Sequence, residues 1–190
     1  MNICVFSGCS GSVKVEYRRA ADELGKEIAR RKHNLIYGGS RLGLMGIVSK
    51  SARDAGAHVT GIVPKIFEHL TGGETELIVV PDFSKRLQEM DARSDAFITL
   101  PGGIGSLYEI MDVLHGRQLN FHSKPLVLIN TLGFYNPLIT QLEMCVKEGF
   151  MPKDNIKMWY KAKNPCEALN YIERYSSSAM SDKIEFAKGK

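Results

Sequence analysis

The sequence alternates short apolar runs with longer stretches in which apolar residues recur at helical spacing. The runs are apolar throughout rather than at every second position, which is typical of strands that a parallel sheet buries on both faces. Alternating strands and helices of this kind predict a doubly wound, Rossmann-like α/β fold, with helices covering both faces of one parallel sheet. The expected strands cover residues 3–6, 34–37, 58–62, 77–80, 96–100 and 126–129.

Helices are expected between these strands, over residues 15–32, 43–55, 83–93, 104–119, 136–147 and 165–174. A chain of 190 residues is long enough for one well-buried core, and no internal repeat or linker divides it. We therefore predict a single three-layer α/β/α domain over residues 1–175. The tail, residues 176–190, has no firm period and is expected to fray or to pack loosely.

Composition narrows the class of partner. The formal net charge is +4, but the basic residues are spread along the chain, which argues against a nucleic-acid partner. No run approaches the roughly 20 apolar residues of a membrane span, and the four cysteines lack C-x-x-C spacing, as in reduced thiols. We predict a cytoplasmic protein with no membrane partner. The five histidines show no metal-ligand spacing, so no metal site is expected.

Glycine-rich turns follow three of the predicted strands. They read FSGCSG at residues 6–11, YGGSRLGLMG at 37–46 and LPGGIGS at 100–106. The carboxyl ends of parallel strands meet at one rim of the sheet, where open α/β sheets bind their ligands. We expect a ligand site at this rim, with Ser7, Gly8, Gly38 and Gly39 among its residues.

The third glycine turn has the features of a phosphate site. Gly102, Gly103 and Gly105 permit positive φ and leave backbone N–H groups uncovered. A helix that starts near Ile104 adds free amides and the positive end of its dipole, and Ser106 adds a hydroxyl. A tight strand-to-helix turn with nothing bound is the alternative, because short glycine motifs often occur without function.

The motifs that the sequence lacks indicate which class of phosphate-bearing ligand fits this turn. It has no P-loop motif and no G-x-S-x-G elbow, and the second strand ends at Tyr37 with no acid for a dinucleotide ribose. A mononucleotide therefore fits better than NAD. Glu109 and Asp112 lie three residues apart on the helix after the glycines, and Glu109 lies within reach of a sugar whose phosphate those amides hold. A solvated acidic helix face is the other interpretation.

Several segments together resemble the LOG family of cytokinin riboside 5'-monophosphate phosphoribohydrolases: YGGSRLGLMG, DAFITLPGGIGSLYE, KPLVLIN and the later GFY and EGF. The resemblance runs from about residue 2 to 175. It implies hydrolysis of the N-glycosidic bond of a purine riboside 5'-monophosphate, either AMP or an N6-substituted AMP. The products are the free base and ribose 5-phosphate, and no metal or organic cofactor is implied.

The resemblance also implies roles for individual residues. The family motif PGGxGTxxE falls on residues 101–109, with Ser106 in place of threonine, and its catalytic glutamate matches Glu109. A second acid of the family matches Asp112. The family's arginine–lysine pair falls on Arg86 and Leu87, so the arginine is kept and the lysine is not. Arg86 is expected to pair with Glu109 or with sugar and phosphate oxygens.

Other readings stay open at this point. Leu87 in place of lysine leaves room for a nucleotide- or molybdenum-cofactor-binding protein without turnover. The label lysine decarboxylase, which some family members carry, finds no lysine in a pyridoxal-phosphate context here. A homodimer is expected, because the family's neighbouring subunits complete each other's sites. The helix over residues 104–119 carries an apolar stripe that fits such a contact: Ile104, Leu107, Tyr108, Met111, Leu114 and His115.

Overall fold

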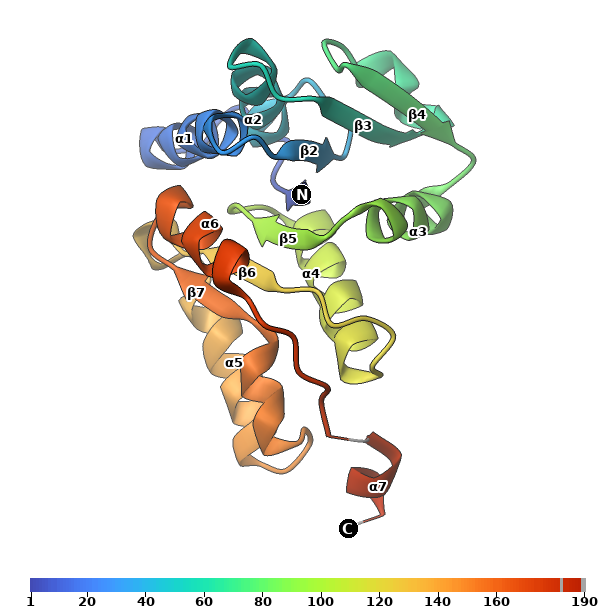
Figure 1. The fold of residues 1–190 in the computed structure, drawn as a ribbon, viewed down its shortest axis with the longest axis vertical. Helices are drawn as coiled ribbons and strands as arrows, with labels where there is room; N and C mark the ends of the chain where they lie inside the picture. The colour runs from blue at the N-terminus through green and yellow to red at the C-terminus, as the bar shows by residue number, and fades with distance from the viewer. Residues whose placement is uncertain (182, 189–190) are drawn as a thin grey trace.

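The computed structural model describes residues 1–181 and 183–188, and these contain one sheet of seven strands in the order β4-β3-β2-β1-β5-β6-β7. Every neighbouring pair is parallel. The strands are β1 (Asn2–Phe6), β2 (Asn34–Tyr37), β3 (Val59–Pro64), β4 (Glu76–Val80), β5 (Ala96–Thr99), β6 (Leu126–Ile129) and β7 (Tyr160–Ala162). The doubly wound, Rossmann-like fold predicted from the sequence is confirmed (Figure 1).

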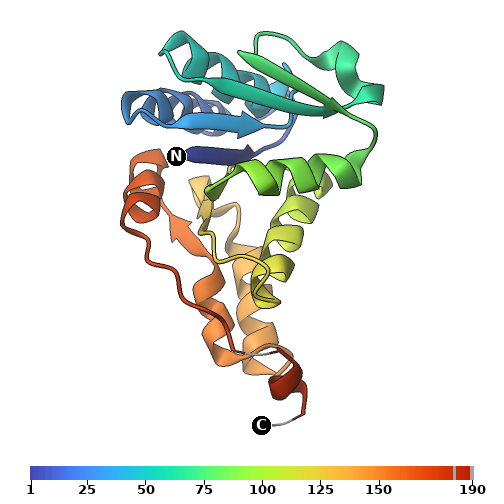
Figure 2. The same ribbon diagram turned by 45° about the vertical axis from the view of Figure 1, so that its right-hand side comes forward.

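Helices cover both faces of the sheet (Figure 2). They are α1 (Val15–Arg30), α2 (Gly43–Asp54), α3 (Phe83–Arg93), α4 (Ile104–Gln118), α5 (Asn136–Lys147), α6 (Pro165–Arg174) and α7 (Lys183–Ala187), with 3₁₀ turns η1 (Lys65–Leu70), η2 (Thr131–Gly133) and η3 (Lys153–Met158). One core packs α1, α2 and α6 against the sheet, and a second core packs α3, α4 and α5 against the other face. The molecule therefore has the expected three layers.

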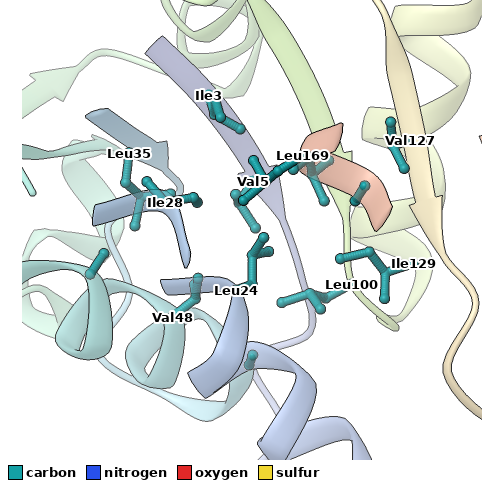
Figure 3. Packing of buried hydrophobic residues seen from close by; sticks show 14 of the residues in the cluster. Ile3, Val5, Leu24, Ile28, Leu35, Val48, Leu100, Val127, Ile129 and Leu169 are labelled. Atoms are coloured by element: carbon teal, nitrogen blue, oxygen red, sulfur yellow. The ribbon is translucent and has the colours of Figure 1, made fainter. Parts of the chain in front are cut away.

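Strand β1 shows how the sequence directs the two cores. Ile3 and Val5 belong to the core under α1, α2 and α6, which Figure 3 shows from close by. Cys4 and Phe6 alternate with them and belong to the core on the opposite face. Because successive strand residues point to opposite faces, a central strand must be apolar at every position to fill both cores.

Several features differ from the sequence-based prediction. Strand β7 was not predicted, and β3 continues to Pro64 rather than ending at residue 62. A three-residue strand leaves too short a pattern to recognise. The prediction that the tail packs loosely is wrong for Met180, which is buried in the second core and exchanges two hydrogen bonds with Asn120. Tail residues 182, 189 and 190 lie outside the described residues.

The order of the strands reverses between β1 and β5, so the chain leaves these two neighbours in opposite directions along the sheet. Such a reversal leaves a crevice at the carboxyl ends of the two strands, where ligands bind in open α/β sheets. Among residues 1–181 and 183–188, no helix combines the length and apolar character needed to cross a bilayer. The cytoplasmic location stays a prediction.

Candidate active site

The loops that follow β1, β2 and β5 are tied together by backbone hydrogen bonds. Gly8 N–H donates to the carbonyl of Pro101 (3.1 Å), and the amide of Leu44, at the start of α2, donates to the carbonyl of Gly8 (2.9 Å). Between them lies a pocket of about 290 Å³. It is lined by Ser7, Gly8, Cys9, Gly38, Ser40, Leu42, Met45, Val63, Pro64, Phe67, Leu70, Phe83, Arg86, Gly105, Ser106 and Glu109.

A buried ion pair lies in the pocket wall. Arg86 Nη1 donates to Glu109 Oε1 at 2.7 Å, and Arg86 Nε donates to the carbonyl of Ile62 at 3.2 Å. Arg86 is 8% exposed and Glu109 is 7% exposed. Two helices bring them together, since Arg86 is in the first turn of α3, whose N-terminus Asp82 caps, and Glu109 is in the second turn of α4. The pairing expected for Arg86 is what the structure contains.

Burial raises the pKa of the Glu109 carboxyl above its ordinary value, and the neighbouring Arg86 guanidinium opposes that shift. A carboxylate in such a place is poorly solvated, so it interacts strongly with any positive charge that develops beside it. It also holds protons more tightly than an exposed glutamate does, which suits a group that accepts a proton from water.

Two glycines make room for these side chains. A Cβ on Gly38 would lie 2.4 Å from Arg86 Nη2, so any other residue there would displace the guanidinium. A Cβ on Gly102 would lie 2.1 Å from Ser106 Oγ, so glycine lets the hydroxyl fold back against the turn. At each position glycine lets a side chain of the same pocket wall approach the backbone closely.

Gly103 and Gly105 behave differently. A Cβ on either would meet no described atom within 4 Å. None of Gly102, Gly103 and Gly105 has positive φ, so this turn does not use the backbone angles that glycine permits. For Gly103 and Gly105, open space in front of the backbone is the feature that glycine provides, and it lies at the N-terminus of α4, where free amides attract anions.

Two serines place hydroxyls at the same end of the pocket. Ser106 is 4% exposed and lies in the first turn of α4. Ser7, the first residue after β1, is 5% exposed, and its Oγ has no hydrogen-bond partner among the described residues. A buried hydroxyl without a partner costs about 1–3 kcal/mol. Because Ser7 lines the pocket, a polar ligand atom is the natural partner for it.

Part of the pocket lining is apolar. Phe67 and Phe83 meet edge to face with their ring centroids 5.8 Å apart, and Leu42, Met45 and Leu70 extend the surface. Sequence reasoning missed this wall because η1, which carries Phe67 and Leu70, is a short 3₁₀ turn outside the helix–strand alternation. The available signal was three large apolar residues, Ile66, Phe67 and Leu70, in a stretch that was assigned to no strand or helix. A pocket with one polar end and one apolar wall suits a ligand that carries a phosphate at one end and a base at the other.

Not every predicted residue reaches the pocket. Asp112 is exposed and lines a separate hollow on the other side of α4, together with Leu87 and His122. Gly39 has positive φ and turns the chain after β2 without lining the pocket. Gly102 and Gly103 lie just outside the lining, while Ser7, Gly8, Gly38, Arg86, Gly105, Ser106 and Glu109 belong to it. In the described part of the chain, no group of three or more His, Cys, Asp or Glu side chains is arranged to hold a metal ion.

The fold of this chain is similar to that of several known structures. The molybdenum cofactor carrier protein of Chlamydomonas reinhardtii superposes with a TM-score of 0.72 at 22% identity, over 91% of this chain and 96% of that one. The molybdenum cofactor binding protein of Rippkaea orientalis superposes with a TM-score of 0.69 at 23% identity, over 90% of this chain and 94% of that one. At this level of identity the likeness concerns the fold alone.

Comparison of sequences goes further. Residues 45–172 match the family model described as possible lysine decarboxylase. Two cytokinin riboside 5'-monophosphate phosphoribohydrolases of Arabidopsis thaliana match most of the chain. LOG4 is 41% identical over 92% of this chain and 82% of its own length, and LOG5 is 40% identical over 91% and 77%. The chain therefore belongs to the LOG family, the family of the cytokinin riboside 5'-monophosphate phosphoribohydrolases.

Proposed function

We propose that this protein hydrolyses the N-glycosidic bond of a purine riboside 5'-monophosphate, AMP or an N6-substituted AMP, and releases the free base and ribose 5-phosphate. The observation that carries the proposal is the buried Arg86–Glu109 pair beside the open N-terminus of α4. The activity after which the Arabidopsis relatives are named supports it. In this proposal Gly102, Gly103, Gly105 and Ser106 form the phosphate end, with the free amides of α4 as donors.

The chemistry assigned to the pair is simple. As the bond from the sugar C1' to the base nitrogen breaks, its electron pair leaves with the base, and positive charge develops on the sugar. The Glu109 carboxylate stabilises that charge and takes a proton from the water that attacks C1'. The proton passes on to the departing base, and Arg86 holds the carboxylate in position. Ser7 and Gly8 lie where sugar or phosphate oxygens would be held.

The test is incubation with a panel of nucleoside 5'-monophosphates that includes AMP and isopentenyladenosine monophosphate. Chromatography should show free base and an equal amount of ribose 5-phosphate from at least one purine member. The variant Glu109→Gln should lose this activity. Its matched control is Glu143→Gln, which changes an exposed side chain on α5 and should keep full activity. A panel that yields no free base would overturn the proposal.

The second candidate is a nucleotide- or molybdenum-cofactor-binding protein without turnover, and Leu87 in place of the family lysine is what favours it. Thermal stabilisation by AMP without release of adenine would support it against the hydrolase. The lysine decarboxylase label has little support, because none of the described residues that line the pocket is the lysine that pyridoxal phosphate needs for a Schiff base.

The homodimer is part of the same proposal. Helix α4 exposes Ile104, Leu107, Tyr108 and Met111, whereas Leu114, which was expected in this stripe, is buried in the core. A row of large exposed apolar side chains on one helix is typical of a contact surface. Light scattering should give twice the chain mass of 21.1 kDa, and a monomer at micromolar concentration would contradict the dimer.

A further inference from the structure

A second hollow, of about 610 Å³, lies at the far end of α4 from the candidate active site. Its wall includes Arg117 from the last turn of α4, Lys157 from η3, Tyr160 from β7 and Tyr171 and Arg174 from α6. The two cavities share no lining residue. Arg117 follows Ser106 along one helix, which separates the two sites by roughly 16 Å at 1.5 Å per residue.

The wall of this hollow carries an excess of positive charge. Arg117, Lys157 and Arg174 form no ion pair with any carboxylate among residues 1–181 and 183–188. Glu167 also lines the hollow, but it already accepts hydrogen bonds from Tyr160 Oη (2.8 Å) and from the backbone amide of Lys163 (2.9 Å). Even with Glu167 counted, the wall has two more positive charges than negative ones.

The burial of Arg117 makes this excess of positive charge unfavourable unless an anion is bound in the hollow. It is 2% exposed, donates from Nη1 to the carbonyl of Lys124 (2.9 Å) and from Nη2 to Tyr175 Oη, and its buried Nε has no acceptor in the described part of the chain. A guanidinium stays charged at any physiological pH, and a buried charge without a counterion is unfavourable. An anion in the hollow would offset that cost.

Aromatic rings line the same hollow. Tyr160 and Tyr171 stack with centroids 4.1 Å apart and planes 5° apart, and Tyr175 lies 5.8 Å from Tyr171 at 50°. The Arg117 guanidinium lies 5.3 Å from the centre of the Tyr175 ring. Tyrosine rings beside arginine and lysine are the combination that holds a planar base through its face and a phosphate through its charge.

We propose that this hollow is a second binding site, for a nucleoside monophosphate whose phosphate pairs with Lys157 and Arg174 and whose base packs against the tyrosines. A phosphate monoester carries about −1.5 to −2 charges at neutral pH, which matches the two-charge excess of the wall. The volume also falls within the roughly 300–1,000 Å³ of small-molecule sites. The site does not depend on turnover at the first pocket.

The experiment is an NMR titration of the ¹⁵N-labelled full chain with AMP, adenosine and inorganic phosphate as separate probes. It is run on the wild type and on Glu109→Gln, so that turnover of AMP at the first pocket does not change the ligand. AMP should shift the amide signals of Tyr160, Tyr171 and Arg174 saturably, with at least tenfold higher affinity than adenosine or phosphate alone. The double variant Lys157→Ala/Arg174→Ala should weaken this binding at least tenfold and leave the shifts around Ser7 and Ser106 unchanged.

The matched control is Lys153→Ala/Lys161→Ala, which removes two exposed positive charges from η3 and β7 outside the hollow and should retain AMP binding. The proposal is overturned if AMP moves only the signals around Ser7 and Ser106. It is also overturned if inorganic phosphate binds the hollow as tightly as AMP, or if the control weakens AMP binding as much as the double variant does. The wild-type titration decides the first point even if a variant fails to fold.

Discussion

Arg86 and Arg117 are both buried in this fold, and both donate a hydrogen bond to a backbone carbonyl, of Ile62 and Lys124 respectively. They differ in what faces the rest of the guanidinium. Arg86 meets the carboxylate of Glu109 at 2.7 Å, whereas Arg117 meets a tyrosine hydroxyl and a tyrosine ring. One buried cation therefore has its counterion inside the chain, and the other has none among the described residues.

This difference bears on how each arginine is used. A buried ion pair contributes little net stability, but breaking it by removing one partner is expensive, because the other charge is left unpaired. Arg86 and Glu109 therefore depend on each other, and Arg86 keeps the Glu109 carboxylate in one position. Arg117 leaves no charge behind if it is replaced, so its positive charge is available to an external anion.

The largest effect should come from replacing the two arginines with an apolar side chain of similar length. Arg86→Met leaves Glu109 buried without a partner and should cost about 3–5 kcal/mol of unfolding free energy, while Arg117→Met should cost about 1 kcal/mol or less. Urea denaturation of both variants measures the difference. Adding Glu109→Gln to Arg86→Met should recover most of the loss. Equal destabilisation by the two arginine variants would contradict the comparison.

The next effect is on turnover. Glu109→Gln keeps the size of the side chain but removes the charge that is proposed to stabilise the breaking glycosidic bond, so kcat should fall by about a hundredfold or more while AMP still binds. Base release by chromatography and binding by calorimetry measure the two quantities, with Glu143→Gln as the control. Turnover near the wild-type rate in Glu109→Gln would show that another group performs the chemistry.

A smaller effect is expected at the phosphate end. Ser106→Ala removes a hydroxyl that is proposed to contact the phosphate equally in the ground state and in the transition state. The loss of one hydrogen bond to a charged group, about 1.5 kcal/mol, should therefore raise KM by roughly tenfold and leave kcat nearly unchanged. Initial rates over a range of AMP concentrations separate the two constants. A fall in kcat with unchanged KM would place Ser106 in the reaction rather than in binding.

The pH dependence should show the burial of Glu109. Its pKa is raised above the ordinary 4.5, so the carboxyl stays protonated to higher pH than in an exposed glutamate. The proposed role needs the ionised form. We therefore expect kcat/KM to have its full value well above the raised pKa, to fall as the pH is lowered, and to reach half of its full value at that pKa. A pH–rate profile measures it. An acid limb centred at or below 4.5 would mean that Arg86 outweighs burial.

The smallest effect is expected at Asp112. This side chain is exposed, forms no ion pair in the described part of the chain, and lines the hollow on the other side of α4 rather than the pocket with Glu109. Asp112→Asn should change kcat/KM by no more than about twofold, as for an ordinary surface substitution. A loss comparable to that of Glu109→Gln would restore the sequence-based view that both acids serve the site.

Most of the fold followed from local patterns. The apolar runs at residues 34–37 and 126–129 and the helical spacing of residues 83–93 and 165–174 agree with the structure at both ends, because each segment buries itself by a rule that depends only on its own period. The sequence analysis did not predict β7 or η1, because three-residue strands and 3₁₀ turns are too short to show a periodic apolar pattern. The apolar pocket surface at Phe67 was missed for the same reason, because Phe67 lies in η1.

The sequence by itself determined the parallel α/β class and the glycine turn before α4 and pointed to Glu109 as the candidate catalytic acid, because these depend on short patterns and on a motif that lies within nine consecutive residues. Only the tertiary structure decided which of two neighbouring acids faces the pocket, since Glu109 and Asp112 differ by less than one helical turn and the packing of α4 sets which side is buried. It also decided that Arg86 has a carboxylate partner and that Arg117 has none among the described residues. Such pairing depends on residues far apart in the chain, 23 positions for Arg86 and Glu109, and no local pattern records it.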